Sequence, residues 1–458
     1  MRELQSEVPM VAPSHQVKIL DRIPMGCALA PFAADAKRVP DRKRQAPGVS
    51  TTLPSVSEAF AKAPSTRITI AQWTRRIASI TLQCGRDARR RLVWLRPWGG
   101  FRMRKLAFVR LAFAALIPLA FSIASPLYGA KAAGKSAPRL AKLPALGVDA
   151  NHVTVSGLSS GGFMAAQFAV IHSSTVTGVG VVAGGPYGCG LGGAMVTPAC
   201  MTGTPSGQGA RLVAEMNEMT GLIDPLAHVK GQRVYLFRGA ADTVVGQGAL
   251  DALRDFYKGV GVPEANLQVL GAFSAQHAFL SLTAASDCGY LGAPFVNHCG
   301  ADGTTGGLPR YDQPGAILSK VLGTPLSAPV DSLSSAPQGF AQAPYLSPLS
   351  EMASTGYLYV PEPCRTAGAN CRIHVVFHGC GQASAYVRDA VYGKLGYNGW
   401  ADSNRIVVLY PQVEKNALAG NPLGCWDWWG YTGPFATRYG PQTRSVQAMI
   451  DRLAQSGS

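Results

Sequence analysis

One serine of this chain lies inside a Gly-x-Ser-x-Gly pattern, at residues 157–161 (Gly-Leu-Ser-Ser-Gly). The β-like run 152–156 precedes it, and the helix-like run 162–168 follows it. A strand, a sharp turn and a helix around such a serine form a nucleophile elbow. The flanking glycines let strand and helix approach closely, and the strained turn projects the hydroxyl from the sheet edge. The pattern therefore predicts that Ser159 is a nucleophile.

The pattern alone is weak evidence for a nucleophile, so the assignment of Ser159 depends on finding a base and an acid to accompany it. The chain has 52 glycines among 458 residues, and random placement gives about 0.4 copies of the pattern. A Gly/Ser-rich loop is the alternative interpretation. A serine hydroxyl also needs a base to accept its proton and a carboxylate to orient that base.

Asp242 and His277 are the candidate acid and base. Asp242 follows the apolar run 234–237, and His277 follows the run 267–271. Side chains just past strand ends meet at the edge where active sites form, although an Asp there also suits an ordinary turn. The order Ser159, Asp242, His277 is that of α/β-hydrolases. The competing bases are His172 at the end of the elbow helix, His228 before Lys230, and His298 between two cysteines.

From about residue 148 the chain alternates short β-like runs with helix-like runs. This predicts an α/β fold with a mostly parallel central sheet and helices on both faces, in one catalytic domain over 148–458. The stretch 324–350 is rich in Pro, Ser and Ala and reads as a linker or surface loop. The predicted strands are Val153–Ser156, Val176–Val182, Arg233–Arg238, Leu267–Gly271, Gly356–Val360, Arg372–Phe377 and Arg405–Tyr410. The predicted helices are Phe163–His172, Gln208–Thr220, Ala249–Lys258, Pro314–Leu322, Ala383–Leu395 and Thr443–Ala454.

The oxyanion hole is expected from two backbone N–H groups. One is that of Ser160, the residue after the nucleophile. The second normally comes from a His-Gly motif before the elbow, but residues 131–157 contain none. The motif occurs instead at 375–382 (Val-Val-Phe-His-Gly-Cys-Gly-Gln), in a strand–helix block that ends the chain. An ordinary turn is the alternative. A circular permutation explains the whole block, with the carboxyl terminus near residue 148 in space.

The excess of positive charge lies outside the predicted domain. The net charge is +16, but residues 1–130 carry 21 Lys/Arg and 7 Asp/Glu, whereas residues 131–458 carry 21 and 19. The folded part is therefore nearly neutral, and we expect no nucleic-acid partner. The absence of any Cys-x-x-Cys pair argues against a zinc ribbon or thioredoxin-like role, and we expect neither metal nor cofactor.

A targeting segment is predicted at 103–133. Met103-Arg104-Lys105 opens a basic region, an apolar run follows from 111 to 124, and small residues then offer cleavage sites. We expect secretion or periplasmic export, with no stable membrane insertion after cleavage, because Arg110 leaves the apolar run short for a spanning helix. Residues 1–102 read as a disordered leader or an over-extended start. A monomer is expected.

Ten cysteines support an oxidising compartment. Cys27 and Cys84 lie in the leader, and the other eight allow 105 connectivities. Proximity in sequence suggests the pairs Cys189/Cys200, Cys288/Cys299, Cys364/Cys371 and Cys380/Cys425.

These residues together resemble the catalytic domains of polyhydroxybutyrate (PHB) depolymerases of the single-domain, circularly permuted α/β-hydrolase type. The resemblance covers roughly residues 150–455. It rests on 156–165 (Ser-Gly-Leu-Ser-Ser-Gly-Gly-Phe-Met-Ala), 184–187 (Gly-Gly-Pro-Tyr), 239–242 (Gly-Ala-Ala-Asp), 276–278 (Gln-His-Ala), 377–382 (Phe-His-Gly-Cys-Gly-Gln), 396–402 (Gly-Tyr-Asn-Gly-Trp-Ala-Asp), 409–412 (Leu-Tyr-Pro-Gln) and 424–431 (Gly-Cys-Trp-Asp-Trp-Trp-Gly-Tyr).

The resemblance implies roles for individual residues. Ser159 becomes the nucleophile, Asp242 the acid and His277 the base, with Ser160 and Cys380 as the backbone oxyanion donors. A Cys380–Cys425 disulfide would pin the oxyanion loop to a tryptophan segment. The aromatic faces of Trp426, Trp428 and Trp429 suit an uncharged polyester, although core packing is the commoner fate of tryptophan, and we expect at most one or two of them to face the cleft.

The function expected from this resemblance is a secreted serine esterase that hydrolyses poly(3-hydroxybutyrate) or its oligomers through an acyl-enzyme. Many secreted members carry a separate polymer-binding module, and none is visible here, so amorphous polymer or soluble oligomers are the expected substrates. A feruloyl or acetyl-xylan esterase is the enzymatic alternative. A binding protein on a hydrolase scaffold is the non-enzymatic one.

Overall fold

The computed structural model describes residues 140–300, 310–366 and 368–456. The predicted leader (1–102) and signal peptide (103–133) lie outside these residues, as do Cys27 and Cys84. Within the described ranges, no helix is both long enough and apolar enough to cross a membrane.

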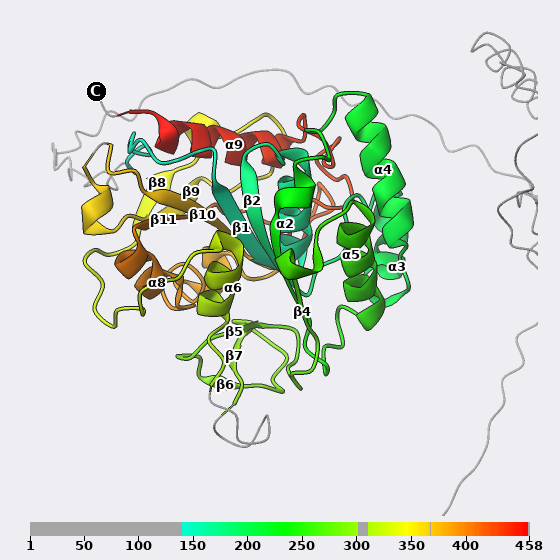
Figure 1. The fold of residues 1–458 in the computed structure, drawn as a ribbon, viewed down its shortest axis with the longest axis horizontal. Coiled ribbons are helices and arrows are strands. Elements are labelled where there is room, and N and C mark those ends of the chain that lie inside the picture. Colours follow the sequence, from blue (N-terminus) through cyan, green and yellow to red (C-terminus); the bar gives the residue numbers. More distant parts are fainter. Residues whose placement is uncertain (1–139, 301–309, 367, 457–458) are drawn as a thin grey trace, which may run out of the picture. The chain divides into compact units, whose positions relative to one another are not determined.

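An eight-stranded sheet forms the centre of the fold (Figure 1). The six strands from β4 to β11 run parallel, and β9 and β8 add an antiparallel edge. This confirms the predicted α/β-hydrolase architecture. In spatial order the strands are β4 (Leu267–Leu270), β3 (Arg233–Phe237), β2 (Val176–Val182), β1 (Val153–Leu158), β10 (Arg372–Phe377), β11 (Ile406–Tyr410), β9 (Thr355–Tyr359) and β8 (Gln338–Ala341).

Helices cover both faces of the sheet, because alternate residues of its strands point to opposite sides. One buried core contains Val153 and Val155 of β1 and the apolar residues of four helices. These helices are α2 (Ser160–Ile171), α4 (Gly207–Met219), α5 (Gln247–Gly259), with most of its buried residues, and α9 (Pro441–Ala454). A second core holds α6 (Gln313–Leu322) and α8 (Tyr397–Asn404). The smaller elements are α3 (Thr197–Thr202), α7 (Ser384–Val387) and a three-stranded sheet of β5 (Phe279–Leu280), β7 (Val296–His298) and β6 (Ser286–Asp287).

The predicted permutation is visible in the order of the strands. β1 is the first strand of the described residues, yet it lies in the middle of the sheet between β2 and β10. The end of α9 lies beside the segment before β1, where Leu146 N–H donates to Leu453 O (3.1 Å) and Gly147 N–H donates to Gln455 O (2.9 Å). The carboxyl end of the described chain is therefore next to residues 146–148, as expected (Figure 1).

Two predicted segments need correction. The expected helix Ala383–Leu395 is wrong, because α7 ends at Val387, where Arg388 adopts a left-handed φ of 54°. A helix forms only later, in α8, after Gly396 with φ 117°. The stretch 324–350, expected to be a linker or loop, contributes the edge strand β8, whose Phe340 is buried in the core.

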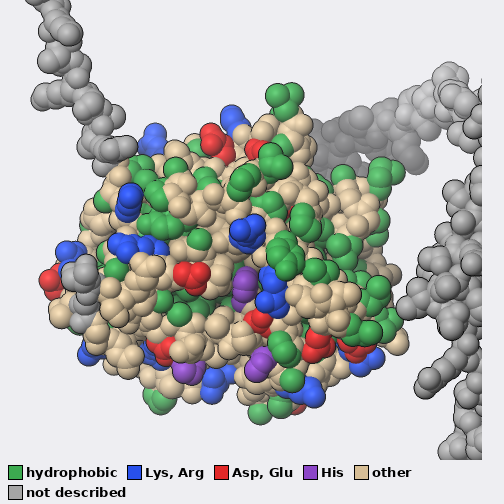
Figure 2. Space-filling view, turned by 90° about the horizontal axis from the view of Figure 1, so that it is seen from above, with side chains coloured by type: hydrophobic (Ala, Val, Ile, Leu, Met, Phe, Trp, Pro, Cys, Tyr) green, Lys and Arg blue, Asp and Glu red, His purple; other side chains and the backbone are tan. Residues whose placement is uncertain are grey.

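The four suggested disulfides are all present: Cys189–Cys200, Cys288–Cys299, Cys364–Cys371 and Cys380–Cys425. They fit folding in an oxidising compartment. On the face shown in Figure 2, Lys, Arg, Asp and Glu side chains are interspersed among hydrophobic ones, which agrees with the near-neutral charge of residues 131–458.

Candidate active site

Ser159 occupies a strained turn between β1 and α2. Its backbone has φ 56° and ψ −122°, a conformation that is uncommon for a residue with a side chain. The turn needs glycine nearby, because a Cβ on Gly161 would lie 2.3 Å from the Phe377 carbonyl oxygen and one on Gly157 would lie 2.1 Å from that of Gly161. The elbow therefore packs directly against the end of β10, which no other residue type would permit.

Asp242 and His277 form a buried pair at the same edge of the sheet. Asp242 follows β3, and His277 follows β4, as Ser159 follows β1. The His277 Nδ1 lies 2.9 Å from Asp242 Oδ2, and their side chains are 6% and 0% exposed. Since an ionised carboxylate only accepts hydrogen bonds, Nδ1 carries the proton and Nε2 is left as the basic nitrogen.

The acid is held by its own loop. Asp242 Oδ1 accepts from the N–H groups of Val244 (2.8 Å) and Val245 (2.9 Å). Arg238, at the end of β3, donates to the carbonyls of Asp242 (2.7 Å) and Val245 (2.8 Å). One oxygen of the carboxylate is thus fixed by backbone, which leaves the other to orient the imidazole.

Ser159 Oγ makes no hydrogen bond to His277 among the described residues. Such bonds are often long in a free enzyme and shorten only when substrate binds. The serine residue as a whole is 8% exposed and His277 is 5% exposed. Both residues are therefore nearly buried.

The competing histidines lie in other environments. His172 packs against Phe168 at the end of α2, and burial lowers its pKa to about 4. His298 lies 3.4 Å from Asp287 in the small sheet, and His228 is exposed before a short 3-10 helix.

The loop after β10 lies against the elbow. A Cβ on Gly379 would be 3.5 Å from the Ser159 Cβ and 3.4 Å from the Leu158 carbonyl oxygen. The N–H groups of Ser160 and Cys380 donate to no acceptor within the described chain, and an N–H in the first turn of a helix has no partner inside that helix. Two unused donors therefore lie on the elbow and on the loop packed against it, and an oxyanion hole requires two such donors.

His378 supports this loop as a neutral imidazole. Its Nδ1–H donates to Gly379 O (2.8 Å), and its Nε2 accepts from the N–H of Val413 (3.1 Å). Burial lowers the pKa of His378 to about 4. Protonation of Nε2 would place two N–H groups against each other, so the neutral ring is part of the loop structure.

The segment 425–426 touches both candidate oxyanion donors. Cys425 is bonded to Cys380, and the N–H of Trp426 donates to Ser160 Oγ (3.3 Å). Two consecutive residues thus hold the loop after β10 and the first turn of α2 together.

The three predicted substrate-wall tryptophans have different surroundings. Trp426 is fully buried against Phe377 and His378, and has no surface left for a substrate. Trp428 is nearly buried and stacks on Phe163 at 4.1 Å between ring centroids. Trp429 is partly exposed. Of the three, only Trp429 presents appreciable surface.

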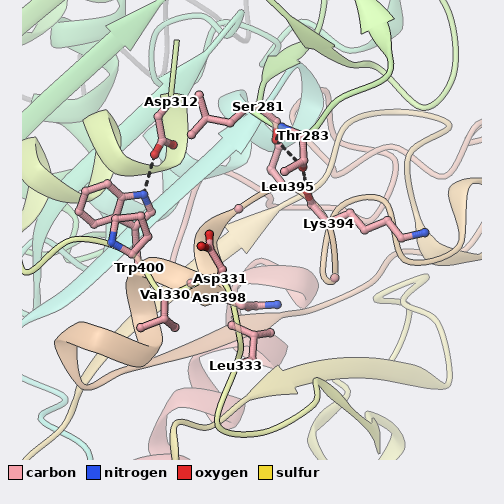
Figure 3. A pocket seen from close by; sticks show the side chains of 15 residues that line it. Ser281, Thr283, Asp312, Val330, Asp331, Leu333, Lys394, Leu395, Asn398 and Trp400 are labelled. Carbon is pink, nitrogen blue, oxygen red and sulfur yellow. Dashed lines mark hydrogen bonds between the residues drawn. The ribbon is translucent and has the colours of Figure 1, made fainter. Parts of the chain in front are cut away.

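Two cavities lie near the carboxyl edge of the sheet. One, of about 420 Å³, is lined by Tyr357, Tyr386 and residues that include 383–385 and 412–415, directly after the loop at 378–382. The other, of about 360 Å³, lies between the starts of α6 and α8 (Figure 3). There the Asp312 carboxylate accepts from the Trp400 indole (2.7 Å). The lining of neither cavity includes Ser159 or His277.

Two residues of this site were not singled out from the sequence. Arg238 holds the Asp242 loop, and Gln382 binds the Gly379 N–H (2.7 Å). Gln382 lies inside the His-Gly motif at 375–382, but nothing in its type or spacing indicates which groups its amide binds.

Comparisons with known proteins agree on one group of relatives. No protein-family model matches the sequence. The chain is 39% identical over 322 residues to a poly(3-hydroxybutyrate) depolymerase of Delftia acidovorans, over 68% of this chain and 61% of that protein. It is 34% identical over 313 residues to a polyhydroxybutyrate depolymerase of Talaromyces funiculosus, over 65% of this chain and 88% of that protein. The chain thus spans less than two thirds of the Delftia relative's length.

Solved structures give the same grouping. A PHB depolymerase from Penicillium funiculosum matches with a TM-score of 0.61 and 31% identity, over 68% of this chain and 98% of that one. A second structure with the same similarity is a serine-to-alanine variant of a PHB depolymerase in complex with an R3HB trimer.

Proposed function

This chain belongs to the PHB depolymerase family, and from that premise we propose that it is a serine esterase that hydrolyses poly(3-hydroxybutyrate) or its oligomers through an acyl-enzyme on Ser159. The observation that carries the proposal is the buried Asp242–His277 pair. It lies at the sheet edge that also presents the strained Ser159 and the loop of Gly379.

Acylation follows from this arrangement. His277 Nε2 accepts the proton of Ser159 as the serine oxygen attacks the ester carbonyl carbon. Asp242 keeps the proton on Nδ1 and stabilises the imidazolium that forms. The N–H groups of Ser160 and Cys380 stabilise the oxyanion. When the intermediate collapses, the C–O bond to the alcohol arm breaks, and that arm leaves with the proton from His277.

Deacylation repeats the same steps with water. His277 Nε2 takes a proton from water, the hydroxide attacks the acyl carbon, and the second oxyanion occupies the same two donors. Collapse returns the proton to Ser159 and releases a 3-hydroxybutyrate unit or oligomer as its acid. No group beyond the side chains and backbone already described is needed.

The parts of the polyester on either side of the cleaved ester need apolar, uncharged surroundings, because the polyester carries methyl groups and ester dipoles. We assign Trp429 and the cavity beside Tyr386 to this task. Trp426 acts instead from the core, where it supports the loop that carries Cys380.

The decisive experiment is the variant Ser159→Ala. The release of 3-hydroxybutyrate from amorphous polyester film and from soluble trimer should fall about 10⁶-fold in kcat. Ser327→Ala, an exposed serine in the 324–350 stretch, is the matched control and should keep full activity. Retained hydrolysis in Ser159→Ala would end the assignment. A parallel panel of feruloyl and acetyl esters tests the carbohydrate-esterase alternative.

We also propose that the enzyme works outside the cytoplasm as a monomer, with residues 148–458 as its catalytic domain and 103–133 as its signal peptide. The four disulfides support an oxidising compartment. Mass spectrometry of secreted protein tests the cleavage position, and sedimentation tests the oligomeric state.

A further inference from the structure

Gln382 is a buried glutamine whose amide makes three hydrogen bonds at the edge of the site. The residue is 1% exposed. Its Oε1 accepts from the Gly379 N–H (2.7 Å), and its Nε2 donates to the carbonyls of Pro294 (3.0 Å) and Phe295 (3.1 Å). The mechanism above gives this side chain no part, yet all of its bonds go to loops beside the proposed triad.

The carbonyls that accept from Gln382 Nε2 connect this side chain to the segment of the proposed base, His277. The carbonyl of Phe295 also accepts from the N–H of Phe279 (3.0 Å), and Phe279 lies two residues after His277. The amide of Gln382 therefore connects the loop of Gly379 with the segment that carries His277. These two segments are far apart in sequence and reach the site from different strands.

The hydrogen bonds around Gly379 fix the orientation of the peptide group between Gly379 and Cys380. Gly379 O accepts from His378 Nδ1 (2.8 Å) and from the Gln382 N–H (3.2 Å), while Gly379 N–H is held by Gln382 Oε1. In a trans peptide the following N–H points opposite to that carbonyl. The bonds to Gly379 therefore aim the Cys380 N–H away from them, and it stays unpaired in the described chain.

We propose that Gln382 is a positioning residue, which sets the Cys380 N–H relative to Ser159 and His277. This inference rests on the proposed function. Without the amide, the Gly379 N–H and the Pro294 carbonyl lose their buried partner, and the loop can relax to satisfy them. A shift of about 1 Å in such a loop costs roughly 100-fold in rate.

Gln232 offers a matched control. It is also 1% exposed, and its Nε2 also donates to two carbonyls, those of Ala169 (2.7 Å) and Val176 (3.0 Å). These bonds join the end of α2 to the start of β2, at the edge of the sheet opposite to Ser159. Gln232 thus makes the same two buried donations with no link to the oxyanion loop, although its Oε1 has no hydrogen-bond partner among the described residues.

The experiment compares Gln382→Leu with Gln232→Leu, beside wild type and Ser159→Ala, on a soluble nitrophenyl ester. Both leucine variants should lower the melting temperature. Gln382→Leu should also lower kcat about 100-fold with KM changed less than about threefold, because the donor acts on the transition state. Gln232→Leu should keep kcat within about twofold.

A second pair of variants covers the case in which Gln382→Leu does not fold. In Gln382→Glu the ionised carboxylate accepts from Gly379 but cannot donate to Pro294 or Phe295, whereas the protonated carboxyl can donate to one of them. The ratio of its kcat to the wild-type kcat should therefore rise as the pH falls. Gln232→Glu should give a ratio that does not change with pH.

The outcomes separate the two proposals. Equal kcat in the two leucine variants, a loss confined to KM, or a pH-independent ratio for Gln382→Glu overturns the role of Gln382. If wild type shows no hydrolysis that Ser159→Ala abolishes, the proposed function fails instead.

Discussion

The backbone N–H of Leu146 donates to the carbonyl of Leu453 at 3.1 Å, so the segment entering β1 lies beside the end of α9. In an unpermuted hydrolase the helix at this place would run directly into the elbow strand. Here the contact is made by hydrogen bonds and by packing of Leu146 with Leu453 in one core. The connection between the two segments is therefore not needed to hold β1 in the middle of the sheet.

A rejoined chain should fold to the same structure. We would connect Gln455 to Leu140 with about ten Gly/Ser residues and open the chain at the exposed Ala336, before β8. We expect the four disulfides to form and kcat to stay within about threefold, because termini close in space tolerate such cuts. Peptide mapping and ester hydrolysis check this. Mispaired cysteines or an insoluble product would show that chain order itself directs folding.

Replacing Asp242 by Asn should lower kcat about 10⁴-fold with little change in KM, because an amide no longer holds the proton on His277 Nδ1. The control is Asp251→Asn, whose half-buried carboxylate on α5 pairs with Arg254. Steady-state kinetics on a soluble ester measure both variants. Comparable activity in the two would remove Asp242 from the triad.

Removing the disulfide Cys380–Cys425 should impair the rate as well as the stability. The Cys380→Ser/Cys425→Ser double variant should lose about 2–5 kcal/mol of unfolding free energy and about tenfold in kcat, because the oxyanion loop loses its covalent link to Trp426. The Cys364→Ser/Cys371→Ser variant removes a bridge that precedes β10. It should lose stability alone. Equal kcat in the two double variants would contradict this prediction.

The free energy of unfolding should fall as the solution is acidified below about pH 6.5. Burial lowers the pKa of His374 to about 3 and those of His172 and His378 to about 4, from an ordinary value of 6.5. Between these values the unfolded chain binds the protons and the native chain does not. Each histidine therefore removes up to about 1.4 kcal/mol per pH unit. Denaturant titrations at pH 7, 6 and 5 measure the slope.

His172 isolates one of these contributions, since its Nε2 is buried with no hydrogen-bond partner in the part of the chain that the structure describes. His172→Phe should keep its stability at pH 7 and show a shallower loss toward pH 5. An unchanged slope would mean that the neutral ring at this position does not contribute.

Much of the architecture follows from local pattern. The strands Val176–Val182 and Arg372–Phe377 were predicted to the residue, because both are apolar runs buried in the centre of the sheet. The order of Ser159, Asp242 and His277 also predicts their common edge, because each follows a parallel strand. The helix at 383–395 could not be excluded in this way, since Arg388 leaves helical geometry in a segment that has a helical pattern.

The sequence by itself determined the nucleophile elbow and its candidate partners, and it indicated the permutation and the cysteine pairs, because each of these depends on residue type and on position along the chain. Only the tertiary structure decided that Trp426 is buried, that Arg238 holds the acid loop and that Gln382 joins the loops of Gly379 and Phe295. The hydrogen-bond partners of a buried side chain are the polar groups that folding brings within about 3 Å of it, and these groups come from distant segments of the chain. The spacing of residues along the chain therefore does not predict these partners.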